Sequence, residues 1–194
     1  MVKCLYVFSL PSNKSFSRCQ FCTTAKENNI KLIHISTDYV FDGTNHKPYV
    51  ETDTPNPQSV YGKTKLAGEQ AMQTINPANS IIIRTSWVYS NYGNNFVKTM
   101  LRLGKERDQL NVVADQIGTP TNAADLAQAI LTSLPKIKNT NVELFHYSNE
   151  GVCSWFDFAK AIFENKEIVI KVNAINSSQY STQATRPFYS MFDK

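Results

Sequence analysis

The sequence has few glycines and no glycine-rich turn. Its seven glycines never form the Gly-x-x-Gly-x-x-Gly spacing with which a backbone turn approaches a pyrophosphate. No apolar stretch approaches the roughly 20 residues of a membrane-spanning helix. Basic residues are dispersed, with a formal net charge of +4, no long basic run and no interleaved stacking aromatics. These features disfavour membrane and nucleic-acid partners and are compatible with an anionic small ligand.

Cysteine is also scarce, and its spacing gives little support for a metal site. Cys19 and Cys22 have the spacing of half a zinc site, but no second pair follows, so chance is the better explanation. His34, His46 and His146 show no ligand spacing. The N-terminal apolar stretch is short and lacks an A-x-A-like site, which makes it a poor signal peptide. We therefore expect no metal site and a reducing, cytoplasmic location.

From Thr24 onward, short apolar strands alternate with helices. Strands are expected at 31–36, 80–85, 111–113 and 143–147, and helices at 24–29, 60–75, 93–106, 122–134 and 154–164. Ser154 and Asp157 have the spacing of a capping box at the start of the last helix. The alternation predicts an α/β fold with a doubly wound parallel sheet.

Three residues in this pattern suggest acid catalysis. Tyr61 and Lys65 are spaced i, i+4 and therefore lie on one face of the expected helix. A nearby ammonium would lower the pKa of the phenol, so that Tyr61 could donate a proton near neutral pH. Thr37 follows a predicted buried strand, where open α/β sheets bind ligands, and its hydroxyl could hydrogen-bond a substrate carbonyl. Alone, the Tyr61 and Lys65 spacing is common by chance on a solvated helix.

Five segments in order resemble the dTDP-4-dehydrorhamnose reductase family, of the extended short-chain dehydrogenase/reductase class. They are STDYVFDGT, KPYVETDTPNPQSVYGKTKLAGEQ, RTSWVYSNYGNNFVKTML, VVADQIGTPTNAADLA and ATRPFYS. The resemblance implies that NADPH, or NADH, reduces the 4-keto group of a dTDP-sugar, dTDP-4-dehydrorhamnose, to give dTDP-L-rhamnose. It allows a homodimer, and it brings in Mg²⁺ only as a family feature, with no site visible in this sequence.

The resemblance also assigns roles to individual residues. Thr37, Tyr61 and Lys65 would form the catalytic set, and Ser36 would join Tyr61 and Lys65 in holding the cofactor. The substrate would be bound by Asp38, Tyr39, Trp87 and Arg186. For Trp87 the alternative is a core aromatic residue beside a strand end, and for Arg186 it is a surface residue.

The residues after Thr37 distinguish between reactions of this class. Related nucleotide-sugar dehydratases carry Asp-Glu at this point, because elimination needs a carboxylate that removes a carbon-bound proton. Here Asp38 is followed by Tyr39. Ketone reduction needs an acid and a hydride source but no such base, so reductase is the better interpretation. The alternative from another class is a non-catalytic regulatory or binding protein of the same fold, like the methionine adenosyltransferase β subunit.

The resemblance begins near residue 24, so we expect a partial Rossmann-like sheet. Residues 24–150 would form the remaining part of a dinucleotide-binding domain, and residues 151–194 part of a small substrate-binding lobe. Residues 1–23 match no part of the family and stay unassigned, which predicts a fragment without its first cofactor-binding units. An interior strand would then become an edge, unless residues 5–10 add a substitute strand.

Overall fold

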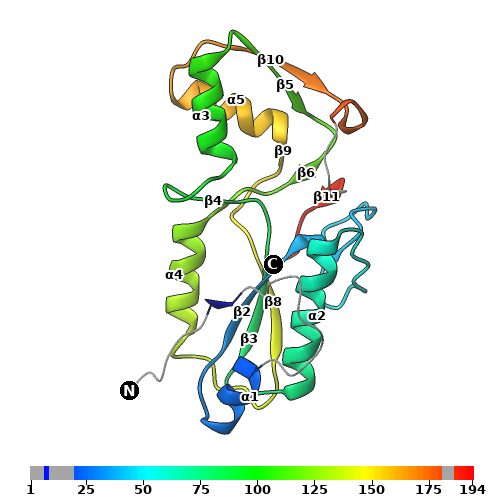
Figure 1. Cartoon of the computed structure of the whole chain (residues 1–194), viewed down its shortest axis with the longest axis vertical. Helices are drawn as coiled ribbons and strands as arrows, with labels where there is room; N and C mark the ends of the chain where they lie inside the picture. Colours follow the sequence, from blue (N-terminus) through cyan, green and yellow to red (C-terminus); the bar gives the residue numbers. More distant parts are fainter. Residues whose placement is uncertain (1–6, 9–19, 181–185) are drawn as a thin grey trace.

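The protein consists of a sheet domain and a smaller lobe, stacked along its long axis (Figure 1). The computed structural model describes residues 7–8, 20–180 and 186–194. The sheet is parallel and lies between helices on both faces, so the predicted α/β, Rossmann-like class is confirmed. Between the two parts, the ends of the strands meet the connections that lead into the lobe.

The main sheet has the strand order β1-β2-β3-β8. Its strands are β1 (Val7–Phe8), β2 (Ile33–Thr37), β3 (Ile81–Thr85) and β8 (Glu143–Tyr147). Thr37 pairs with Thr85 and Thr85 with Tyr147, all in parallel. The carboxyl ends of these three strands therefore lie in one row, at the edge of the sheet where ligands bind in open α/β folds.

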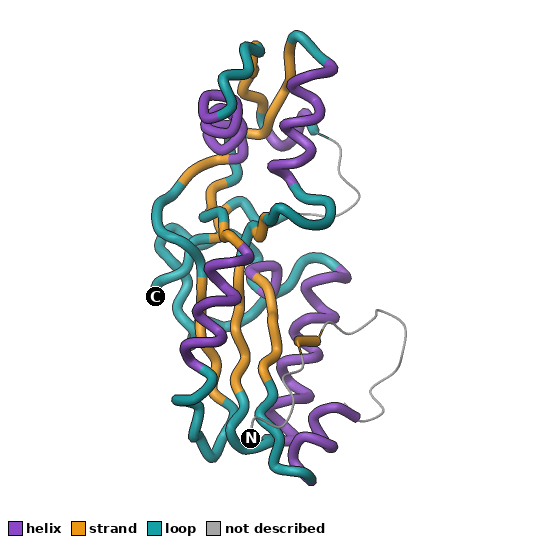
Figure 2. The backbone as a smooth tube through the Cα atoms, turned by 90° about the vertical axis from the view of Figure 1, so that its left-hand side faces the viewer, coloured by secondary structure: helices purple, strands orange, loops and turns teal. Residues whose placement is uncertain are grey.

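Alternate residues of the strands face different helices, as expected for a sheet covered on both sides. Ile81 and Ile83 pack against α4 (Ala123–Ser133), whereas Ile82 packs on the opposite face with Met72 of α2 (Val60–Ile75). Helix α1 (Gln20–Glu27) joins α2 on that second face. Figure 2 shows the strands between these helical layers. The continuous apolar sequence of β3 is thus explained by burial on both faces.

The lobe has its own core, built from two separate parts of the chain. Helix α3 (Phe96–Glu106) and strand β5 (Gln109–Val113) pack with α5 (Trp155–Asn165) and β10 (Lys171–Ile175), which pairs with β5 in parallel. The predicted capping box of Ser154 and Asp157 is confirmed at the start of α5. The lobe therefore draws on residues 96–113, which the sequence alone assigned to the sheet domain.

Short strands connect the lobe to the sheet domain. β4 (Val88–Tyr89) pairs with β7 (Thr121–Asn122), and β6 (Ile117–Gly118) lies between β9 (Cys153–Ser154) and β11 (Tyr189–Ser190). A bridge from Tyr49 to Phe192 brings the last residues back to the loop that follows β2. The described residues include the 3-10 turns η1 (Asp38–Val40), directly after β2, and η2 (Ser177–Gln179).

Strand β1 lies within residues 5–10, the segment expected to supply a substitute strand. Val7 and Phe8 pair in parallel with Ile33 and His34 of β2. The opposite edge of the described sheet is β8, whose His146 N–H donates a hydrogen bond to the Glu51 carboxylate at 2.9 Å. The free edge of β2 is thus covered by β1, and the backbone of the edge strand β8 has at least one partner outside the sheet, the Glu51 carboxylate.

A glycine allows close contact between α2 and η1. A Cβ atom on Gly62 would lie 2.1 Å from the Tyr39 carbonyl oxygen and 2.9 Å from Pro57 Cβ. Gly62 is therefore required at this helical position, although glycine normally costs a helix about 0.5–1 kcal/mol relative to alanine. The contact fixes the first turn of α2 against the turn that follows Thr37.

We predict that Gly62→Ala lowers the free energy of unfolding by about 1–3 kcal/mol, because the added methyl group overlaps backbone atoms. Urea unfolding followed by circular dichroism would measure it. The neighbouring exposed residue provides the control: Lys63→Ala should change stability by less than about 0.5 kcal/mol. Unchanged or increased stability of Gly62→Ala would contradict the close approach of the two segments.

Candidate active site

The predicted catalytic residues meet where β2 ends and α2 begins. Thr37 is the last residue of β2, and Tyr61 and Lys65 lie in the first two turns of α2. Helix α2 begins here because Ser59 caps it, accepting a hydrogen bond from the Gly62 N–H at 3.0 Å. The structure therefore brings together three residues that are separated by 28 positions in the chain.

Thr37 links Tyr61 to Asp38. The Thr37 hydroxyl donates a hydrogen bond to Asp38 Oδ1 at 2.9 Å and also shares a hydrogen bond with the Tyr61 side chain. The Tyr61 ring packs edge-on against Tyr39, with ring centroids 5.5 Å apart. Tyr61 is 51% exposed, whereas Thr37 and Asp38 are buried. The phenol is therefore the member of this group that a ligand can reach.

Lys65 does not lower the pKa of Tyr61 as the sequence suggested. Burial raises the pKa of Tyr61, the hydrogen bond with Thr37 partly opposes this, and the charge of Asp38 raises it further. The Lys65 ammonium points instead to the backbone, where it donates to the Ile35 carbonyl. The expectation of an acidified phenol is wrong: the pKa of Tyr61 is raised, and the Lys65 ammonium is held by the backbone of β2.

Glu69 and Arg84 extend the site below the sheet edge, and sequence reasoning missed both. Glu69 accepts hydrogen bonds from Arg84 Nε at 3.0 Å, from Arg84 Nη2 at 2.7 Å and from the Ser36 hydroxyl. The predicted cofactor residue Ser36 thus uses its hydroxyl hydrogen within the protein. One signal was available: Glu69 follows Lys65 by four positions, and Arg84 interrupts an otherwise apolar strand.

Tyr39 and Arg186 lie near each other, although they are far apart in the chain. Burial raises the pKa of Tyr39, and the positive charge of Arg186 opposes that change. The residue after Arg186, Pro187, packs closely on the loop that follows β2, since a Cβ atom on Gly43 would lie 2.5 Å from it. The exposed Arg186 is thereby placed beside the Tyr39 and Tyr61 pair.

Trp87 belongs to an aromatic group at the base of the lobe. Its ring stacks on Trp155 with centroids 3.6 Å apart, and its backbone adopts a left-handed conformation with φ of 49°. A Cβ atom on Gly118 would lie 2.6 Å from the indole, so that glycine leaves room for the ring. Trp87 lies two residues beyond the end of β3 and is partly buried. Its contacts are therefore those of a core aromatic residue beside a strand end, which was the alternative to a substrate contact.

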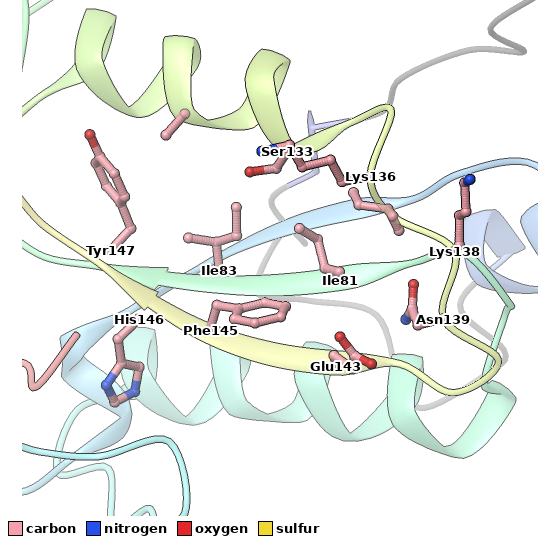
Figure 3. Close-up of a pocket in the computed structure, with 12 residues that line it drawn as sticks. Ile81, Ile83, Ser133, Lys136, Lys138, Asn139, Glu143, Phe145, His146 and Tyr147 are labelled. Carbon is pink, nitrogen blue, oxygen red and sulfur yellow. The ribbon is translucent and has the colours of Figure 1, made fainter.

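The groove shown in Figure 3 lies on the other face of the sheet and contains none of the predicted site residues. It has a volume of about 580 Å³, between α4 and the strands β3 and β8. Its lining includes Ile81, Ile83, Phe145 and Tyr147. Among residues 7–8, 20–180 and 186–194, no three or more acidic, histidine or cysteine side chains are grouped so that they could hold a metal ion. Cys19 lies outside the described residues, and Cys22 is disulfide-bonded.

Asp38 is a buried carboxyl group with an unusual ionisation. Burial raises its pKa from 3.8 to about 6, although hydrogen bonds with Ser190 and Thr37 oppose the shift. The folded protein therefore binds this proton more tightly than the unfolded chain does. Its contribution to stability falls as the pH rises from about 4 to about 6, and stays constant above that range.

We predict that Asp38→Asn removes the loss of stability that the ionisation of Asp38 causes as the pH rises. A shift of about two pH units corresponds to about 3 kcal/mol, so the stability of the variant relative to the parent should rise by about 2–3 kcal/mol between pH 4 and pH 7. Urea unfolding at a series of pH values would measure it. Asp157→Asn is the opposite control, because hydrogen bonds from Ser154 lower the pKa of Asp157 and its stabilisation is lost at low pH. A parallel pH dependence of Asp38→Asn and the parent would contradict the assignment.

The chain is similar in sequence and fold to known proteins. The model of the RmlD substrate binding domain matches residues 14–194. A dTDP-4-dehydrorhamnose reductase of Aggregatibacter actinomycetemcomitans is 47% identical over 178 residues, covering 87% of this chain and 60% of that protein. The spore coat polysaccharide biosynthesis protein SpsK of Bacillus subtilis is 43% identical over 161 residues, covering 83% of this chain and 55% of that protein.

A solved structure shows the same arrangement of elements. The crystal structure of dTDP-4-dehydrorhamnose reductase from Bacillus anthracis, in complex with NADP, superposes with a TM-score of 0.82 at 44% identity. The match covers 89% of this chain and 59% of that one. The chain thus spans between 55% and 60% of the length of the curated relatives given above. By the extent of these matches, it belongs to the RmlD substrate binding domain family.

Proposed function

We propose that the chain carries the proton-donating and substrate-binding part of an NADPH-dependent reductase that converts dTDP-4-dehydrorhamnose to dTDP-L-rhamnose. The observation that carries the proposal is the meeting of Thr37, Tyr61 and Lys65 at the carboxyl end of β2. Membership of the family and relatives that bear this name support it. The activity is that of a complete enzyme, of which this chain corresponds to somewhat more than half.

Tyr61 is the proton donor in this proposal. The phenol is protonated at neutral pH, because burial raises the pKa of Tyr61 above its ordinary value, and its exposed position lets the hydroxyl reach a substrate oxygen. Thr37 can donate to the same oxygen once its hydrogen leaves Asp38, since a hydroxyl has one hydrogen to give. A carbonyl oxygen held by both hydroxyl groups would be polarised and then protonated.

Lys65 and Ser36 are the residues that would hold the cofactor. NADPH, when bound, supplies the hydride for the ketone carbon. An ammonium has three N–H donors, and Lys65 uses one for the Ile35 carbonyl, which leaves donors for ribose hydroxyl groups. The Ser36 hydroxyl is held by Glu69, so a contact with the cofactor would have to use its oxygen as an acceptor or its backbone.

The remaining predicted residues surround the place for the sugar nucleotide. Arg186 offers a positive charge for a diphosphate, beside Tyr39 and the exposed Tyr61. Asp38 and Trp87 are proposed as further substrate contacts at the ends of β2 and β3. Asp38 is followed by Tyr39 rather than by a second carboxylate, which supports reduction over elimination. We also propose a cytoplasmic location and a homodimer. No helix in the described part of the chain could cross a membrane.

The proposed activity can be tested in a chimera. Residues 24–194 would replace the corresponding part of the Aggregatibacter relative, so that the cofactor-binding units come from that protein. We expect the chimera to oxidise NADPH in the presence of dTDP-4-dehydrorhamnose, and Tyr61→Phe to lower kcat at least about 100-fold, because the proton donor is lost while the ring remains. The decrease in NADPH absorbance would measure both rates.

Two controls make the result decisive. The unaltered Aggregatibacter protein shows that substrate and assay are sound, and Lys63→Ala, on the exposed side of α2, should keep the rate of the chimera. A chimera that folds and binds NADPH but shows no turnover would contradict the proposed function. So would a Tyr61→Phe chimera that keeps more than about a tenth of the rate.

For the 194-residue chain alone, we predict much weaker NADPH binding than for a complete relative. The chain has no glycine-rich turn for the pyrophosphate, and Lys65 by itself provides few contacts. Titration followed by nicotinamide fluorescence would measure the affinity, with the Aggregatibacter protein as the reference. A micromolar dissociation constant for the 194-residue chain would contradict this expectation.

A further inference from the structure

Tyr61, Lys65 and Glu69 follow one another at intervals of four residues on α2. They therefore lie on the same side of the helix, which faces β2 and β3. Exposure decreases along this row: Tyr61 is 51% exposed, Lys65 6% and Glu69 1%. The row thus leads from the accessible phenol to a carboxylate in the protein interior.

The Glu69 carboxylate joins α2 to two strands. It accepts two hydrogen bonds from Arg84 of β3 and one from the Ser36 hydroxyl of β2. Both partners are only 3% exposed, so the charge pair has almost no access to water. An ion pair in such surroundings gains its favourable energy through precise geometry and further hydrogen bonds.

The same helical face is attached to three consecutive residues of β2. Lys65 donates to the Ile35 carbonyl, Glu69 accepts from the Ser36 hydroxyl, and Tyr61 shares a hydrogen bond with Thr37. Arg84 directly precedes Thr85, which pairs with Thr37. A shift of α2 along the sheet would therefore break contacts of all three helical residues together.

The charged groups around this face come from every element packed on it. Glu69 on α2 is the negative charge beside Lys65, and Arg84 on β3 is a second buried cation. His146 on β8 responds to Glu69, Arg84 and Glu51, whereas Asp38 acts on Tyr61. Burial lowers the pKa of Lys65, and the Glu69 carboxylate opposes that change.

We propose that Glu69 is a positioning residue that keeps the Lys65 ammonium charged and holds the Tyr61 face of α2 against the ends of β2 and β3. The idea rests on the proposed function for its meaning, because a neutral Lys65 would neither attract ribose hydroxyl groups as strongly nor stabilise a tyrosinate. Glu69 itself does not touch the reacting atoms.

The test measures the ionisation of Lys65 in the 194-residue chain, without substrate or turnover. Lysines labelled with carbon-13 at Cε would be titrated by NMR, and Lys65→Met would assign the signal. Glu69→Gln keeps the size of the side chain and an oxygen acceptor but removes the charge. We expect the titration midpoint of Lys65 to fall by about one pH unit or more, a tenfold or larger change in its ionisation constant.

Two variants separate the charge from the attachment. Ser36→Ala removes one hydrogen bond to Glu69 and leaves its charge, so the Lys65 midpoint should stay within a few tenths of a pH unit. Glu106→Gln removes a carboxylate that pairs with Arg102 on the exposed surface of α3, and should leave the Lys65 midpoint unchanged. A similar fall in either control would overturn the proposal.

Glu69→Gln leaves Arg84 buried without its partner and is expected to be less stable. If it does not fold, the double variant Glu69→Gln with Arg84→Gln replaces the pair with two neutral amides and should show the same fall of the Lys65 midpoint. An unchanged midpoint in either folded variant would reduce Glu69 to a structural role and overturn the proposal. This outcome would leave the proposed reductase activity intact, and an inactive chimera would leave the NMR result intact.

Discussion

The buried charge pair of Glu69 and Arg84 is the constraint on which the site depends. Removing one partner from such a pair typically costs about 3–5 kcal/mol, because the other charge stays in the interior without compensation. A helix, two strands and the Ser36 hydroxyl must therefore fit together before the pair can form. The charge pair forms only when β2 and β3 have their parallel register and α2 lies in its observed position. The same arrangement brings Thr37 and Tyr61 together.

Much of this arrangement could be predicted from local sequence patterns. The helix from residue 60 to 75 was predicted within a residue, because the Ser59 cap and the Asn76-Pro77 stop mark both ends. Strands around Ile33 and Ile82 were also predicted, because continuous apolar runs are typical of strands buried on both faces. Thr37, Tyr61 and Lys65 were expected to lie together because strand ends and helix spacing are local properties of the sequence, and their catalytic role stays a prediction.

The features that were missed depend on contacts between distant segments. Strand β10, Lys171–Ile175, mixes polar and apolar residues, and only pairing with β5 makes it a strand. The lobe core joins residues 96–112 to 155–172, which no local pattern links. Likewise, helix spacing places Lys65 near Tyr61, but it cannot show that the ammonium points to the Ile35 carbonyl instead.

The hydrogen bond of Glu51 to the edge strand β8 affects how readily copies of the protein associate. β8 is an edge strand of the described sheet, and Phe145 on it is 43% exposed, which makes this edge attractive to a foreign strand. The Glu51 carboxylate occupies the outward N–H of His146, and the Tyr49 carbonyl lies 3.0 Å from the His146 ring. The Glu51 side chain thus occupies a backbone N–H of this edge with which an extra strand could otherwise pair, and the Tyr49 carbonyl contacts the His146 side chain. The loop that carries Tyr49 and Glu51 follows Thr37 and η1 in the chain, so a displacement of the loop from β8 would expose the backbone of this edge to other chains.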